Sequence, residues 1–423
     1  MNEPRTVQLK LSALSVFRGI MRRSVPQAFY RLLCALDSAP ADFLRAYGAF
    51  FALLSERGCT GRLAYALTEA ALFDENSFTR SAAAGAENHL PAEVLQAAAA
   101  DCTAILEAAN LSAEAVLEAY AHYDQIAPVA ATLPRWQCGD CAEAFRDFDG
   151  ALDLPAQWYR ANGCGIFARY KAFIWRDGDI QPVFNYDAID LDDFTGYERQ
   201  RDKVMQNTLA FLDGKSCNNC LLYGDMGTGK SSTVKAVANA YRTRGLRIVE
   251  MPKERLTDFP LLVDKLAQLP LKFIIYIDDL SFQYQDGTYT ALKAVLEGGL
   301  AARPQNALIY ATSNRRHLVK ERLSDRAIEV DDVHTRDNMQ ETLSLSDRFG
   351  LAVCYTAPSK QEYLDIVRAM AQQRGIAVAD EALCAGAERF ALSRGGRSPR
   401  CAKQYIESLF CEQRLQPHNN REV

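Results

Sequence analysis

Long apolar runs are missing from this sequence. No stretch reaches about 18 uninterrupted apolar residues, the length that a helix needs to cross a bilayer. The opening segment, MNEPRTVQLKLSALSVFRGIMRR, has neither a long apolar core nor a small-residue cleavage site. We therefore expect a cytoplasmic protein with no membrane partner.

A strong excess of either charge is also missing. The 48 Lys and Arg residues are nearly balanced by 53 Asp and Glu residues, which leaves a net charge of -5. This balance gives no overall basic signature of nucleic-acid binding, although a local basic face remains compatible with it. Apolar residues make up 48% and charged residues 24%, which is ordinary for globular proteins and argues against long disordered segments. We expect the whole chain to fold, as two or three domains.

The twelve cysteines form no disulfide framework that we can recognise, because they are scattered and no secretory signal accompanies them. Two CxxC pairs occur, Cys138 with Cys141 and Cys217 with Cys220, and together they could form a four-thiolate zinc site. Cys220, however, opens a strand that leads into a glycine-rich loop, where a small apolar residue is needed. A structural role is the favoured interpretation.

Four segments differ in character along the chain. Residues 1–130 are rich in Ala and Leu, with apolar residues at three- and four-residue spacing, which predicts an all-α interaction or regulatory domain. Residues 131–189 contain alternating aromatic and polar residues around Asp177-Gly178, which predicts a linker with a β-hairpin. Residues 190–357 alternate strand and helix patterns, and residues 358–423 are helical. The predicted fold class is α/β, with a parallel sheet and a C-terminal helical lid.

The strongest motif lies in CLLYGDMGTGKSSTVKAVANA, an apolar strand, a glycine-rich loop and an amphipathic helix. This order satisfies the pattern GxxxxGK[ST] in the context that the phosphate loop requires. The glycines let backbone amides turn inward around phosphate oxygens, and the helix presents its positive end to them. Lys230 should reach the β- and γ-phosphates, and Ser231 should bind Mg²⁺. The predicted ATP-binding residues are Gly224, Asp225, Met226, Gly227, Thr228, Gly229, Lys230, Ser231 and Ser232.

A second apolar strand ends in paired acids. Phe273–Ile277 are followed by Asp278 and Asp279, an arrangement that suits metal-dependent phosphoryl transfer. We expect Asp278 to hold Mg²⁺ through water and Asp279 to orient or deprotonate the attacking water. The structural alternative is that both acids cap a nearby helix.

These residues resemble the AAA+ superfamily of P-loop ATPases, and the whole pattern resembles a family of uncharacterised bacterial AAA+ ATPases with an N-terminal helical region. The segments that carry the resemblance are LLYGDMGTGKSSTVKA, FIIYIDDLSF, ALKAVLEGGLAARPQNALIYATSNRRHL, LSLSDRFG and RGGRSPRCAKQYIESL, about half of the chain. The resemblance implies a parallel-sheet core, an inserted strand between the two motif strands, and a helical lid.

The resemblance also implies catalytic roles outside the two motifs. Asn314 matches the sensor-1 position, although it could be a turn residue. Arg348 matches the arginine finger that a neighbouring subunit supplies, although it could pair with Asp347. Arg400 resembles sensor 2 on the lid, with Arg397 as the alternative, and the sequence does not separate the two. The segment from Leu191 to Tyr197 is the place where adenine selection is expected.

Two departures from the superfamily pattern affect the predicted activity. Asp279 stands where Glu is usual, so hydrolysis could be slow, and MPKERLTDF lacks the aromatic-glycine pore loop of protein-unfolding members. We expect an ATPase that uses ATP and Mg²⁺, works as a homo-oligomer, and remodels, loads or regulates an unidentified protein or nucleic-acid client. The alternative is a nucleotide-dependent switch that binds ATP or ADP with negligible turnover.

Overall fold

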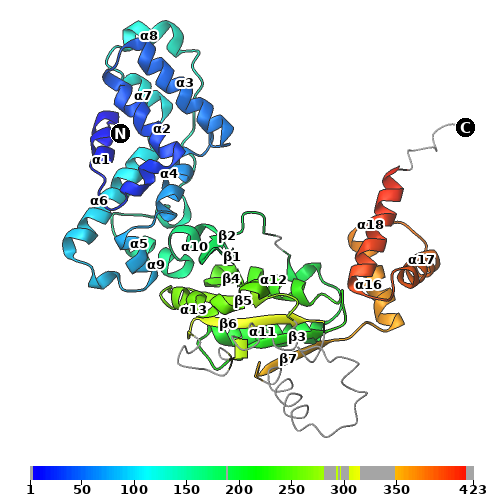
Figure 1. The fold of residues 1–423 in the computed structure, drawn as a ribbon. Helices are drawn as coiled ribbons and strands as arrows, with labels where there is room; N and C mark the ends of the chain where they lie inside the picture. Colours follow the sequence, from blue (N-terminus) through cyan, green and yellow to red (C-terminus); the bar gives the residue numbers. More distant parts are fainter. Residues whose placement is uncertain are drawn as a thin grey trace, which may run out of the picture. The chain divides into compact units, whose positions relative to one another are not determined.

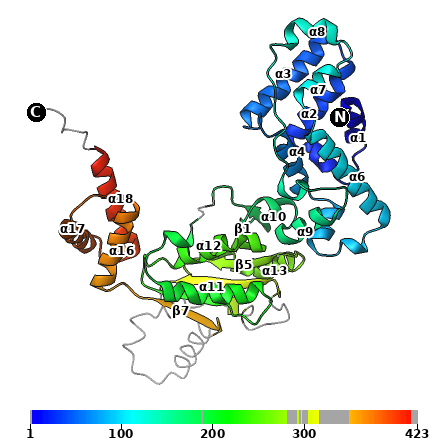
Figure 2. The same cartoon turned by 180° about the vertical axis from the view of Figure 1, so that it is seen from behind.

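The computed structural model describes residues 3–186, 189–280, 292–293, 296, 304–314 and 348–415. The chain divides into two compact units, each described here by itself (Figures 1 and 2). The first comprises residues 1–170 with 269–271, and the second comprises residues 171–268 and 272–423. Within the described residues, no helix is both long enough and apolar enough to span a bilayer.

The first unit is built from short helices around one apolar core, as the Ala- and Leu-rich pattern predicts. Its aromatic centre includes Trp136, which lies edge-on against Phe29 and Phe50 and donates from Nε1 to the backbone oxygen of Leu111 at 3.1 Å. Its helices are α1 Pro4–Ser12, α2 Ser24–Cys34, α3 Pro40–Glu56, α4 Leu63–Leu72, α5 Ser77–Ala83, α6 Ala92–Ala109, α7 Ala113–Glu118, α8 Tyr123–Ala130, α9 Asp153–Asn162 and α10 Gly165–Arg169.

The structure differs from the predicted linker at residues 131–189. Trp136 and Tyr159 are buried in the core of the first unit, so the segment up to Tyr170 belongs to the helical unit. The hairpin forms as predicted, with β1 Ala172–Arg176 and β2 Asp179–Pro182 joined by Asp177 and Gly178, both at positive φ. The hairpin is not part of a separate linker, however, because β1 pairs with β4 (Leu246–Glu250) of the seven-stranded sheet.

The second unit is an α/β sandwich with a helical lid. Its described strands form one sheet in the order β2-β1-β4-β5-β6-β3-β7, in which every neighbouring pair except β1 and β2 is parallel. The remaining elements are α11 Glu198–Leu212, β3 Cys220–Gly224, α12 Lys230–Ala240, β4 Leu246–Glu250, α13 Phe259–Ala267, β5 Lys272–Ile277, β6 Ala307–Ser313, β7 Leu351–Tyr355, α16 Lys360–Gln373, α17 Asp380–Ser393 and α18 Pro399–Leu415.

Alternate residues of each strand point to opposite faces of the sheet, and helices pack on these faces. Side chains of α11 and α12 pack on one face together with alternate residues of β3, β4, β5 and β6. The opposite face of β1 carries Trp175, which contacts α13 through Lys265 over its ring and donates a hydrogen bond to Asp258. The central strands β4, β5, β6 and β3 are mostly buried on both faces, and Thr312 and Ser313 place polar side chains at the end of β6.

The sheet order explains where a ligand can bind. The phosphate-loop strand β3 lies between β6 and β7, and β6 separates it from β5, which ends in the paired acids. This is the inserted strand that the resemblance implies. Since all three strands run parallel, their carboxyl ends meet at one edge, where parallel α/β sheets bind their ligands.

Candidate nucleotide-binding site

The phosphate loop connects β3 to α12 and depends on its glycines. Gly224, Gly227 and Gly229 have φ values of 128°, 74° and 93°, a region that other residues rarely adopt. At Gly224 a Cβ atom would lie 2.1 Å from the backbone oxygen of Tyr355, so β7 also requires a glycine there. The loop and the first turn of α12 therefore have the strand-loop-helix arrangement for which the sequence predicts an anion cradle.

Lys230 is buried at the start of α12, with a side chain that is held by the loop itself. Its Nζ donates to the backbone oxygens of Gly224 at 2.9 Å and Asp225 at 2.6 Å. Burial lowers the pKa of this ammonium group, while the charges of Asp225 and Asp279 oppose the shift. A cation desolvated in this way is well placed to attract phosphate oxygens in exchange for two neutral carbonyls.

Asp278 is the centre of a hydrogen-bond network at the ends of β5 and β6 and at the start of α12. Its Oδ1 accepts hydrogen bonds from Ser231 Oγ at 2.8 Å and from Thr312 Oγ1 at 2.5 Å. Burial alone would raise the pKa of Asp278, but the hydrogen bonds from Thr312 and other donors lower it overall. The carboxylate is therefore kept ionised beside the phosphate loop.

Asp279 and Asn314 are brought together from neighbouring strands. Asn314 Nδ2 donates to Asp279 Oδ1 at 2.7 Å, and the Asp279 amide donates to Thr312 Oγ1 at 3.0 Å. Asp279 also adopts a φ of 48°, an uncommon conformation for a non-glycine residue and one that often marks a functional site. The predicted sensor-1 residue and the predicted catalytic acid are thus in direct contact.

The contacts of Arg397 and Arg400 in the lid distinguish these two candidates for the sensor-2 position. Arg397 makes a bidentate ion pair with Glu388 on α17, at 2.8 Å for each hydrogen bond. Arg400 lines the pocket, and its backbone amide donates to the oxygen of Gly227 in the phosphate loop at 3.1 Å. The geometry favours Arg400 for the sensor-2 role.

Arg348 does not line the pocket of its own chain. It precedes β7 at the amino end of the strand, where Gly350 packs against Asn218 just before β3. The phosphate loop follows the opposite, carboxyl end of β3. The structure therefore places Arg348 away from the phosphate loop of its own chain.

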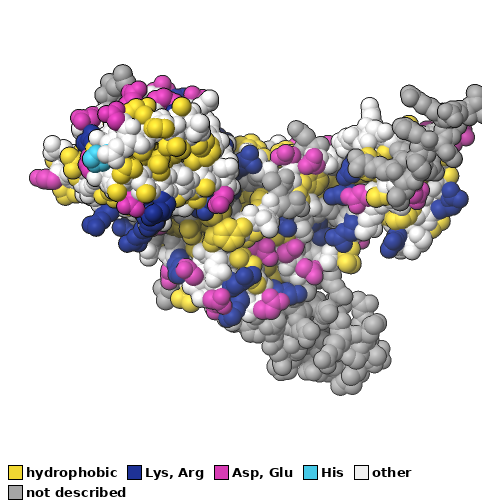
Figure 3. Space-filling model, turned by 90° about the horizontal axis from the view of Figure 1, so that it is seen from above, with side chains coloured by type: hydrophobic (Ala, Val, Ile, Leu, Met, Phe, Trp, Pro, Cys, Tyr) yellow, Lys and Arg dark blue, Asp and Glu magenta, His cyan; other side chains and the backbone are white. Residues whose placement is uncertain are grey.

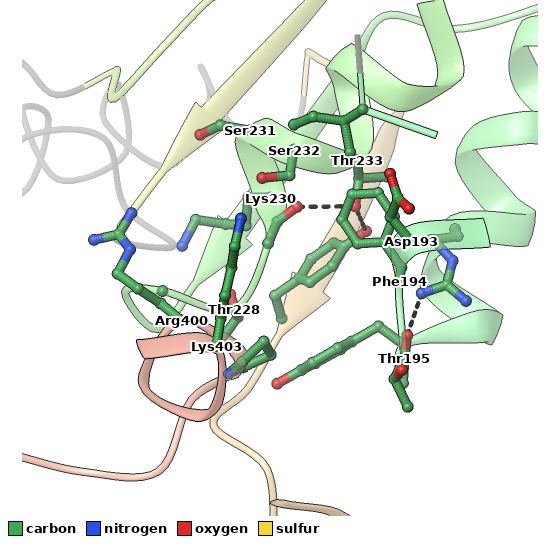
Figure 4. Close-up of a pocket in the computed structure, with 18 of the residues that line it drawn as sticks. Asp193, Phe194, Thr195, Thr228, Lys230, Ser231, Ser232, Thr233, Arg400 and Lys403 are labelled. Atoms are coloured by element: carbon green, nitrogen blue, oxygen red, sulfur yellow. Dashed lines mark hydrogen bonds between the residues drawn. The ribbon is translucent and has the colours of Figure 1, made fainter. Parts of the chain in front are cut away.

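One cavity of about 780 Å³ joins these groups, a size typical of cofactor sites. Figure 4 shows its phosphate end, where Lys230, Arg400 and Lys403 come from α12 and α18. Aromatic residues from the predicted adenine segment line another part, including Phe194 and Tyr197, and Tyr197 stacks on Tyr355 with ring centroids 5.3 Å apart.

The sequence interpretation missed three residues of this site. Thr312 lies on β6 two residues before Asn314, which follows the strand, and the period-two alternation of a strand directs residues at this spacing to the same face. Lys403 follows Arg400 by one helical turn, so helical spacing could have revealed it. Arg201 donates to the backbone oxygen of Gly196, lies 5.6 Å from the Phe194 ring centroid and also lines the cavity. No motif marks that arginine.

The donor set fits the implied ligands. Ser231 and Asp278 offer a hydroxyl and a carboxylate oxygen, the hard donors that Mg²⁺ prefers beside nucleotide phosphates. Cations line the phosphate end of the cavity, as a polyanion requires. The residues present are therefore compatible with ATP and Mg²⁺.

Fold and site together define a P-loop NTPase of the AAA+ type, since the inserted strand β6 lies between the phosphate-loop strand β3 and the acid-bearing strand β5, and a helical lid follows β7. The chain belongs to the family described as "Protein of unknown function (DUF815)", whose model matches residues 168–413. The resemblance drawn from the motifs is confirmed. No functionally curated protein matches the sequence.

Solved structures with a related fold include a RuvB A156S mutant of Thermotoga maritima, with 17% identity and a TM-score of 0.36 over 52% of this chain and 64% of that one. DnaA from Aquifex aeolicus bound to AMPPCP has 16% identity and a TM-score of 0.36, over 55% of this chain and 68% of that one. The replication initiator DnaA bound to AMPPCP and single-stranded DNA has 16% identity and a TM-score of 0.37, over 55% of this chain and 70% of that one. The chain thus spans less than two thirds of the RuvB mutant. Likenesses at this level concern the fold alone.

Proposed function

We propose that this chain is a Mg²⁺-dependent ATPase that works as a homo-oligomer and remodels, loads or regulates a macromolecular partner. The observation that carries the proposal is the network in which Ser231, Asp278, Asp279, Thr312 and Asn314 meet beside the phosphate loop. A structural metal-free turn has no need for two adjacent carboxylates, a buried lysine and a cationic lid around one cavity. Hydrolysis of a nucleoside triphosphate uses groups of these kinds to bind the phosphates, hold the metal and position the water.

The proposed reaction is attack of water on the γ-phosphorus, with cleavage of the bond to the β-γ bridging oxygen and release of ADP and phosphate. Asp279 orients the water and accepts its proton, and Asn314 holds the carboxylate in place. Lys230 and Arg400 balance the charge that develops on the phosphate oxygens. Ser231 and Asp278 would hold Mg²⁺, which supplies charge neutralisation between the β- and γ-phosphates.

Arg348 is the proposed contribution of a second subunit. Because it lies at the amino end of β7, outside its own pocket, an oligomer is needed to complete the site. Turnover per subunit should therefore rise as the protein assembles. The partner remains a protein or nucleic acid of unidentified type.

The helical unit is the proposed region for binding that partner. Several large hydrophobic side chains are exposed on it, including Leu9, Tyr65, Tyr123 and Val129. Figure 3 shows hydrophobic side chains gathered on the face of this unit that is seen from above. Exposed apolar groups of this kind are typical of a surface that another molecule covers.

A second candidate function is a nucleotide-dependent switch with negligible turnover. One observation favours it: the Asp279 carboxylate is one methylene shorter than the usual Glu and is already engaged by Asn314. Such a carboxylate would have to move before it could reach a water on the γ-phosphate. In that case ATP occupancy alone would set the state of the partner.

The test is steady-state phosphate release from Mg²⁺-ATP at increasing protein concentration, with molecular mass followed by light scattering. We expect turnover per subunit to rise with assembly, Lys230→Ala to lose nucleotide binding, and Asp279→Asn to bind ATP without hydrolysing it. Unchanged hydrolysis in both variants would refute the site. Tight ATP binding without release at any concentration would support the switch instead.

A further inference from the structure

Helix α18 carries two basic residues on the face that lines the cavity. Arg400 and Lys403 are three residues apart, so about 4.5 Å of helix rise separates them. Figure 4 shows both side chains beside Lys230 at the phosphate end of the pocket. Of the two, only Arg400 matches a motif position, that of sensor 2. Lys403 has no role assigned by the resemblance.

Three other basic residues of the lid have partners in the lid. Arg397 pairs with Glu388, Arg368 pairs with Asp380 at 2.7 Å, and Arg374 lies 3.8 Å from Glu407. Within the part of the chain that the structure describes, the side chains of Arg400 and Lys403 make neither an ion pair nor a hydrogen bond. Both are exposed, so each can turn toward an anion in the cavity without first breaking an existing interaction.

The order of residues along α18 assigns different positions to the two cations. The helix starts against the phosphate loop, where the Arg400 amide bonds to Gly227. One turn beyond Lys403 the lining becomes apolar, with Ile406 from α18 and Met370 from α16. Lys403 therefore lies between the loop end and the apolar end of the cavity. In a bound nucleotide, the inner phosphates lie between the terminal phosphate and the base, as Lys403 lies between the two ends of the cavity.

The electrostatics agree with this order. Arg400 is close enough to the Lys230 ammonium to lower its pKa, although burial is the larger cause of that shift. Arg400 thus lies in the same region as Lys230, which is expected to bind the β- and γ-phosphates. Three cations at one phosphate would repel one another, whereas three cations spread along a triphosphate are each balanced by separate negative charges.

We propose that Lys403 binds the α- and β-phosphates of the nucleotide from the lid, while Arg400 binds the γ-phosphate. The inference rests on the proposed function, because it assumes that ATP occupies the cavity. Its consequence is that the lid engages ADP through one cation and ATP through two. Loss of the γ-phosphate would then loosen the lid without releasing it.

The experiment measures equilibrium binding of Mg²⁺-ATP and Mg²⁺-ADP by calorimetry to the full chain and its variants. Lys403→Gln should weaken ATP and ADP by about tenfold each, the size expected for one charge-assisted hydrogen bond, so that the ratio of the two affinities stays constant. Arg400→Gln should weaken ATP more than ADP. Lys403→Arg keeps the charge and should retain most of the affinity.

Arg389→Gln is the matched control, because Arg389 is an exposed lid cation on α17 that does not line the cavity. It should leave both affinities unchanged, and all variants should melt at the wild-type temperature without nucleotide. The inference is overturned if Lys403→Gln binds both nucleotides within about twofold of wild type, or loses ATP affinity alone.

The two proposals fail in distinguishable ways. If the wild type binds ATP and Lys230→Ala does not, an unchanged Lys403→Gln variant refutes the role of Lys403 and leaves the nucleotide site intact. A wild type that binds neither nucleotide refutes both.

Discussion

Asn314 Nδ2 lies 2.7 Å from Asp279 Oδ1 and joins the residues that follow two neighbouring parallel strands, β6 and β5. The hydrogen bond fixes the direction of a carboxylate whose backbone is itself in an uncommon conformation. Positioning of this kind acts on the chemical step more than on binding, because neither atom belongs to the phosphate cradle.

Asn314→Ala should therefore lower kcat by roughly ten- to a hundredfold and change the affinity for ATP by less than about threefold. Single-turnover hydrolysis together with equilibrium binding separates the two effects. Asn314→Asp is the companion variant, because it places a second carboxylate against Asp279 and should be equally slow. A wild-type kcat in Asn314→Ala would show that the contact is only structural.

Arg348→Ala should reduce turnover of the assembled protein by roughly a hundredfold or more, since an arginine finger stabilises charge on the transferring phosphate. Nucleotide binding by dilute monomers should not change, because Arg348 is remote from its own pocket. Arg199→Ala removes an exposed arginine from α11 and serves as the control. An equal loss of binding in isolated monomers would contradict the finger role.

Gly224→Ala should destabilise the second unit and abolish nucleotide binding. The added methyl group would lie 2.1 Å from the Tyr355 backbone oxygen, so β3 and β7 would have to separate at the start of the phosphate loop. Gly214→Ala is the matched control, because Gly214 also has a positive φ but faces open space. It should cost only about 1 kcal/mol of folding free energy. Thermal unfolding of both variants measures the difference, and equal melting temperatures would contradict the steric argument.

Lys171 should make folding stability depend on pH in alkaline solution. Burial, with the charges of Arg247 and Arg242, lowers the pKa of Lys171 from 10.5 to about 7. Between these two values the unfolded chain binds the extra proton, so stability should rise as pH increases from about 7 to about 10. Partial exposure reduces the effect to the order of 1–3 kcal/mol.

Lys171→Met should remove this rise and stabilise the protein near neutral pH. Denaturant unfolding of the wild type and the variant at pH 7 and pH 9.5 measures the effect. Lys203→Met changes an exposed lysine on α11 and should keep the wild-type pH dependence. A wild type whose stability falls between these pH values would disprove the assignment.

Local sequence patterns predicted the strands and turns whose structure is determined by residues that are adjacent in the sequence. The strand before Gly224 and the strand from Phe273 to Ile277 both form as their apolar spacing indicates. The hairpin at Asp177-Gly178 also forms, because a two-residue turn at positive φ is specified by its own residues.

Contacts between distant segments could not be predicted in the same way. The pairing of β1 with β4 joins residues about 75 positions apart, and nothing in either strand specifies it. Nothing in the sequence around Trp136 indicates that it packs against Phe29 and Phe50, so the segment that contains it was predicted to be a linker. Arg397 and Arg400 are equivalent in a sequence motif, and only the ion pair with Glu388 separates them.

The strand β7 continues without a break into the connection that carries the lid. In that connection the Ala357 amide donates to the Asp225 carboxylate at 2.6 Å, and the Tyr197 hydroxyl donates to the Thr356 oxygen at 2.6 Å. The connection that begins the lid is therefore fastened to the phosphate loop and to the segment before α11. A rearrangement of the loop around bound phosphates would be passed directly to the start of α16, and a small rotation there would become a larger displacement at the far end of α18.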